Sequence, residues 1–78
     1  MKAKLNIEKI LDRVPTEEEL LDMPTLEAVY VIRILVAALR SQHFNQTIIL
    51  NDEPNDIGQY YSEMYRMWFS ADEIVKWE

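Results

Sequence analysis

The residues that could perform nucleophilic or acid–base chemistry are few in this chain of 78 residues. The sequence contains one histidine, His43, one glycine, Gly58, and no cysteine. Ser41 lies two residues before His43, but this spacing alone is not a nucleophile–base signature. A phosphate-binding loop needs several glycines, and a thiolate nucleophile needs a cysteine. The sequence therefore predicts no catalytic residue, and we expect a protein that is not an enzyme.

Carboxylates are abundant, but their spacing does not predict a metal or cofactor site. Oxygen-bearing side chains alternate at Asn51, Glu53 and Asn55, as they do in a calcium-binding loop. The turn glycine that such a loop needs is displaced to Gly58, and the twelfth position is Ser62 in place of a bidentate glutamate. One histidine without cysteine also argues against zinc. We expect neither a metal nor a cofactor.

A cluster of acids could instead act through its charge. Residues 17–27 contain five acids and no base. The net charge is −6, and an acidic chain is not expected to bind nucleic acid through its phosphates. An acidic surface improves solubility, and it can also speed association with a basic protein. The predicted partner-binding acids are Glu17, Glu18, Glu19, Asp22 and Glu27.

The segment from Asp56 to Phe69 combines a capping-box pattern with many aromatic residues. It predicts an amphipathic helix whose apolar side chains cover an arc of about 200°, which is wider than a small bundle needs. Aromatic and methionine side chains are enriched in the cores of interfaces, so we expect another chain to bury the edges of this face. The residues at those edges are Tyr60, Tyr65, Met67 and Phe69.

Capping residues predict the other helices. Asn6 can cap a short helix through about Arg13, and Thr16 opens a capping box for a helix that ends at Met23. Ser70 opens a last capping box and a final helical turn that includes Ile74, Val75 and Trp77. Thr25 is the expected cap of the longest helix.

The longest helix is expected from Leu26 to about Ser41 and is apolar nearly all round. A helix of this kind is buried on most sides, which predicts a central helix. Residues 29–36 are rich in β-branched side chains, and a buried strand is the alternative there. Length and the segment from Ala37 to Arg40 favour the helix.

These elements predict an all-α fold, a compact bundle of four to five short helices in a single domain over residues 1–78. Residues 46–50 are the candidate for one short β-strand, although no hairpin partner lies beside them in the sequence. The longest apolar run, from Val29 to Leu39, is shorter than the ~20 residues that a membrane span needs. No secretory signal precedes it, so we expect a soluble, cytoplasmic protein without membrane contact.

Two functions fit these features. The first is a small acidic protein-binding module that docks on a larger basic protein, such as a nucleic-acid-processing enzyme, and inhibits it, as proteins of phages and mobile elements do. The second is a self-associating structural or accessory subunit, in which the aromatic face and residues 47–50 pack against another copy. An enzyme that uses carboxylates alone is a third alternative.

Overall fold

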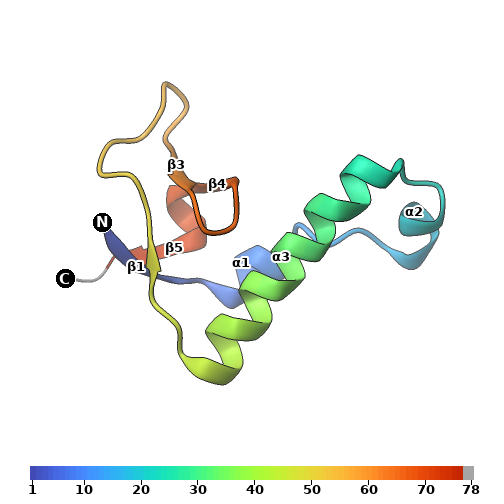
Figure 1. The fold of residues 1–78 in the computed structure, drawn as a ribbon, viewed down its shortest axis with the longest axis horizontal. Coiled ribbons are helices and arrows are strands. Elements are labelled where there is room, and N and C mark those ends of the chain that lie inside the picture. Colours follow the sequence, from blue (N-terminus) through green and yellow to red (C-terminus); the bar gives the residue numbers. More distant parts are fainter. Residues whose placement is uncertain (77–78) are drawn as a thin grey trace.

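The computed structural model describes residues 1–76 and shows a mixed α/β fold (Figure 1). The expected all-α bundle of four to five helices is therefore wrong. Within the described residues, three α-helices and one 3-10 turn are combined with five strands in two antiparallel sheets. The helices are α1 (Ile7–Leu11), α2 (Glu17–Leu21), α3 (Thr25–Phe44) and the 3-10 turn η1 (Ala71–Glu73). The strands are β1 (Lys2–Leu5), β2 (Ile48–Ile49), β3 (Gln59–Ser62), β4 (Met67–Ser70) and β5 (Ile74–Lys76).

The N-terminal strand β1 lies at the centre of the three-stranded sheet, whose order is β2-β1-β5. Ala3 is paired with Ile48 on one side, and Leu5 is paired with Ile74 on the other. The short strand expected near residues 46–50 is thus present as β2, and its partner is the start of the chain. The alternation of lysine with Ala3 and Leu5 is the local signal for β1, because both apolar side chains are buried.

The helix predicted from Asp56 to Phe69 is wrong, because these residues form the β3–β4 hairpin. Tyr60 is paired with Phe69, and both side chains are buried. The next pair, Tyr61 and Trp68, lies on the other face of the hairpin, where the two rings meet edge to face with their centroids 5.1 Å apart. Burial therefore follows a period of two. The aromatic content that we assigned to a helix face also favours strands.

Backbone conformation at two positions explains why a helix does not form over this segment. Gly58 has φ 80° and Arg66 has φ 53°, and both values lie in the left-handed region that ends a right-handed helix. The predicted cap at Asp56 is also replaced, because the Asn55 side chain accepts hydrogen bonds from the N–H groups of Ile57 and Gln59 at 3.1 and 2.8 Å. This arrangement closes a turn that leads directly into β3.

Several predicted caps are confirmed. The Asn6 side chain accepts from the N–H of Lys9, and Thr16 and Glu19 form the expected capping box. The capping box at Ser70 is also present, with its N–H donating to Glu73 at 2.8 Å, but it opens only the short turn η1. The chain then continues as β5, so the predicted final helical turn is wrong. Its residue Trp77 lies outside the described residues.

Helix α3 confirms the predicted long helix and excludes a strand over residues 29–36. Its boundaries differ from the expected ones, since it begins at Thr25 and ends at Phe44. Thr25 is the first residue of the helix and not its cap, and no side-chain hydrogen bond caps this end. Asn45 ends the helix in the left-handed conformation, φ 50°. The preceding helix α2 also ends earlier than predicted, at Leu21.

The core is formed where α1 and one face of α3 pack on the three-stranded sheet and the hairpin. From α3 it receives Ile34, Ala37 and Ala38, and the largest fully buried side chain is Phe69 of β4. The first turns of α3 and the whole of α2 extend away from the sheets (Figure 1). The radius of gyration is 12.7 Å, compared with about 11.5 Å for a compact chain of this length. The projecting end of α3 accounts for this excess.

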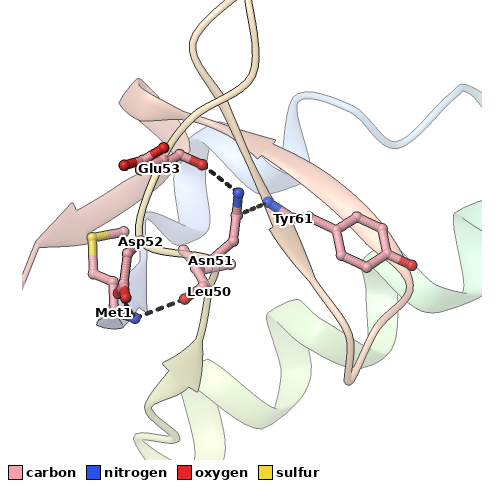
Figure 2. Close-up of polar contacts among 6 residues, drawn as sticks. All are labelled: Met1, Leu50, Asn51, Asp52, Glu53 and Tyr61. Carbon is pink, nitrogen blue, oxygen red and sulfur yellow. Dashed lines mark hydrogen bonds and ion pairs between the residues drawn. The ribbon is translucent and has the colours of Figure 1, made fainter.

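Residues Leu50 and Asn51 connect the two sheets (Figure 2). The N–H of Leu50 donates to the carbonyl of Met1 at 2.8 Å, and the N–H of Asn51 donates to the carbonyl of Tyr61 at 3.0 Å. The Asn51 side chain adds two further hydrogen bonds, since it accepts from the N–H of Tyr61 and donates to the carbonyl of Glu53. These two residues are therefore bonded to Met1, which directly precedes β1, on one side and to Tyr61 of β3 on the other.

The same junction contains an exposed ion pair. The ammonium group of Met1 donates to the carbonyl of Leu50 at 2.7 Å and lies 2.8 Å from the carboxylate of Asp52. Its hydrogen bond and its charge lower the pKa of Asp52 below the ordinary value. Because Asp52 is exposed, we regard this pair as a minor contributor to stability.

Replacement of the buried aromatic side chain of the hairpin tests the corrected fold. We expect Phe69→Ala to lower the free energy of unfolding by about 3–5 kcal/mol, because it leaves a cavity in the centre of the core. Urea denaturation followed by circular dichroism measures this change. Ile57→Ala is the matched control, since Ile57 is 76% exposed and its truncation should change stability by less than about 0.5 kcal/mol. Equal effects of the two substitutions would contradict the assigned core.

Candidate protein-binding surface

The predicted acidic residues lie at the end of the molecule that is farthest from the sheets (Figure 1). Glu17, Glu18 and Glu19 form the first turn of α2, and Asp22 follows that helix directly. All four side chains are exposed, and we call them the acidic tip. Glu27 is also exposed, in the first turn of α3. The fold therefore gathers the predicted acids at one end of the molecule.

The four predicted aromatic-face residues are located differently. Tyr60, Tyr65, Met67 and Phe69 are all buried in the core cluster. Tyr65 lies in the turn of the hairpin, and its hydroxyl donates to the side chain of Gln46 at 2.9 Å. The apolar surplus that suggested a second chain at this face therefore does not exist, because each of these side chains is covered by its own chain.

An apolar surplus is present instead on the solvent side of α3. Val29, Ile32, Val36 and Leu39 are 38%, 58%, 39% and 52% exposed, respectively. At 100° per residue these four side chains lie within an arc of about 80°. The buried residues Val31, Ile34, Ala37 and Ala38 occupy an arc of about 120° whose centre is about 180° away. We call the four exposed residues the α3 stripe.

The sequence contains a signal for this surface, because the helix is apolar nearly all round. That pattern predicts a helix that is buried on most sides, and the exposed residues of the α3 stripe are not predicted from it. The structure covers only one side of it, because a sheet of three short strands and a five-residue helix cannot surround twenty residues of helix. Further large apolar side chains lie exposed near the two ends of α3: Leu21, Leu26 and Phe44.

Charge is distributed unevenly along α3. Its one acid is Glu27 in the first turn, whereas its two arginines, Arg33 and Arg40, lie further along. Arg33 is placed over the ring of Tyr30 at 5.7 Å, while Arg40 and the imidazole of His43 are exposed in the last turns. Together with the acidic tip, this places carboxylates at the N-terminal end of α3 and the guanidinium group of Arg40 near its C-terminal end.

A polar depression of about 320 Å³ lies between α1 and the C-terminal turn η1. Within it, Arg13 lies 3.4 Å from the carboxylate of Glu73 and donates to the carbonyl of Trp68 at 3.2 Å. Its guanidinium group also lies 5.9 Å from the centre of the Phe69 ring. Glu73, which is buried, additionally accepts from the N–H of Ser70. These groups bond to one another and hold the fold together, so the depression does not offer them for chemistry.

A second depression, of about 420 Å³, is apolar and lies between β2 and β3. Ile49 and Met64 line it and are largely exposed, and the polar side chain beside them, Asn51, is already hydrogen-bonded within the chain. Glu63 is the one acidic residue of its lining. A single exposed carboxylate in an open apolar hollow does not form an acid–base pair.

The described residues also form neither a metal-binding cluster nor a nucleophile–base pair that involves His43. Residues 1–76 contain no group of three or more histidine, cysteine or acidic side chains placed to hold a metal ion. Ser41 and His43 lie two positions apart on α3, and side chains at that spacing do not face each other. None of the helices in this range is both long and apolar enough to cross a membrane.

Comparisons with protein-family models, curated proteins and solved structures give no match for this chain. The α3 stripe and the acidic tip are therefore the features from which a function can be inferred.

The contact between Arg13 and Glu73 generates a test of its structural role. We expect Glu73→Gln to lower the free energy of unfolding by about 1–3 kcal/mol, because it removes a charged hydrogen-bond partner from a mostly buried site. Asp72→Asn, at the exposed neighbouring position, should change it by less than about 0.5 kcal/mol. Denaturant titration measures both values. A neutral Glu73→Gln variant would contradict a structural role for this pair.

Proposed function

We propose that this chain is a protein-binding module that attaches to another polypeptide through the solvent face of α3. The observation that carries the proposal is the α3 stripe. A surface helix normally carries polar side chains on the side opposite the core. Contiguous exposed apolar surface on a small soluble domain is the usual mark of an interaction site. A partner that covers Ile32 and Val36 would remove this surface from water.

The acidic tip supports a partner with basic groups beside its apolar contact. Its four carboxylates lie at the end of α3 from which the stripe begins, so a partner seated on the stripe also approaches them. Charges at the rim of an interface mainly steer association and set orientation. In this proposal the stripe supplies the affinity and the acidic tip supplies the preference for a basic surface.

Some predictions made from the sequence are not part of this proposal. The buried residues Tyr60, Tyr65, Met67 and Phe69 have no place in the proposed surface. Inhibition of a nucleic-acid-processing enzyme and a phage origin have no supporting feature in the described residues. A non-enzymatic role stays a prediction, and the absence of cysteine fits the reducing cytoplasm that we propose as the location.

Site-specific photo-crosslinking tests the proposed surface directly. A photoreactive amino acid that replaces Val36 should yield a covalent adduct with a polypeptide in a cell lysate, because this position lies in the middle of the stripe. The same amino acid at Ile57, which is equally apolar and more exposed but lies in a loop, is the matched control. Adducts that are absent at residue 36, or equally abundant at residue 57, would contradict the proposal.

Charge reversal at the acidic tip tests the contribution of the acids. We expect a variant with lysine at Glu17, Glu18 and Asp22 to bind the crosslinked partner about tenfold more weakly at low salt, with a smaller difference at high salt. A binding titration at two ionic strengths measures this effect. Asp56→Lys is the control, because this exposed acid lies in the loop before β3. An unchanged affinity would show that the acids do not contribute.

A further inference from the structure

We infer that the partner on the α3 stripe is a second copy of this chain, whose α3 lies antiparallel to the first. This inference rests on the proposed function, because it takes the stripe as the docking face and identifies its occupant. The geometry that carries it is the spacing of the stripe, together with the opposite charges at the two ends of α3.

The spacing of the stripe fits a helix as the occupant. Val29, Ile32, Val36 and Leu39 follow one another at intervals of three, four and three residues. This is the spacing by which two helices pack along a narrow apolar seam. A partner surface that complements the seam is a second helix with the same spacing, and α3 of another copy provides one.

An antiparallel pair places the stripe in a self-complementary register. With a two-fold axis at the level of residue 34, Val29 of each chain lies opposite the partner's Leu39, and Ile32 lies opposite the partner's Val36. Each contact then occurs twice, as a two-fold interface requires. All four apolar side chains of both chains are covered.

Charge selects the antiparallel direction. A parallel pair would bring the two acidic tips together, where their like charges repel each other. The antiparallel pair instead brings each acidic tip to the end of the partner's α3 that contains Arg40. Opposite charges on the two copies of α3 therefore meet in the antiparallel pair and not in the parallel pair.

One contact opposes the pair and limits its affinity. Arg33 lies at the flank of the stripe close to the two-fold axis, where it approaches the partner's Arg33. Each guanidinium group is placed over the ring of its own Tyr30, which directs it along the helix surface. The net charge of −6 per chain adds further repulsion. We therefore expect a dimer that dissociates on dilution.

Light scattering across a range of concentrations is the first test. The wild-type chain should have the mass of two chains at high concentration and that of one chain after dilution. Ile32→Glu should raise the dissociation constant about a hundredfold or more, because each chain would place a carboxylate in the seam. Ile57→Glu, with the same change outside the stripe, should behave as the wild type. Circular dichroism verifies that both variants are folded.

Cysteine crosslinking tests the direction of the helices and does not depend on the glutamate variants. The natural chain contains no cysteine, so every disulfide reports on the introduced residues. A mixture of Val29→Cys and Leu39→Cys chains should crosslink efficiently. Val29→Cys alone should not, because two copies of residue 29 would be about 15 Å apart along the antiparallel pair, beyond the ~7 Å reach of a disulfide.

The outcomes separate this inference from the proposed function. Crosslinking of Val29→Cys alone would overturn the antiparallel arrangement, and a dimer that persists in Ile32→Glu would overturn the interface. A monomer at every concentration that still photo-crosslinks a different protein from residue 36 would overturn the second copy while leaving the docking face intact. A monomer without any adduct at residue 36 would contradict both.

Discussion

The pairing of the N-terminal strand with two distant parts of the chain is the constraint on which this structure depends. Ala3 lies between Ile48 and Lys76, so the central strand of the main sheet is completed only when the middle and the end of the described chain have returned to its start. Contacts of this kind require the closure of long loops before any of their free energy is gained. The neighbouring strands β2 and β5 contain only two and three residues, so the sheet is narrow. Its size then determines how much of the long helix can be covered.

A narrow sheet explains both the core and the exposed surface of α3. The side of the helix that faces the sheet and α1 carries the small residues Ala37 and Ala38, which allow close approach of the backbones, together with Ile34. The opposite side, where Ile32 and Val36 lie, stays exposed within the described residues. The helix is thus apolar on two opposite sides. One side packs in the core, whereas the side chains of the α3 stripe are not part of the core within the described residues.

Local signals were sufficient to predict some of the helix caps. Asn6 and Thr16 cap the helices that their side chains predicted, because a cap involves only the next few residues. The hairpin was misassigned because a run of aromatic residues fits a wide helix face as well as alternate strand positions, and the turn through Arg66 has no glycine or proline to mark it. The pairing of β1 in the sheet could not be deduced, because its partner strands β2 and β5 are far away in the sequence. The acidic tip can be predicted because charged side chains are normally exposed in any fold. The α3 stripe cannot, because its exposure depends on how much of α3 the sheet covers.

The two features of the candidate surface differ in how strongly they require a partner. Acids near the start of α3 and bases near its end are also what the dipole of the helix favours, so the charge polarity stabilises α3 in an isolated chain as well. The α3 stripe has no such intramolecular explanation. Four branched apolar side chains at regular spacing on the solvent side of a helix lower its solubility and contribute nothing to its own core. In the proposed complex, charge orients the partner, but the proposal that there is a partner rests on the uncovered apolar seam from Val29 to Leu39.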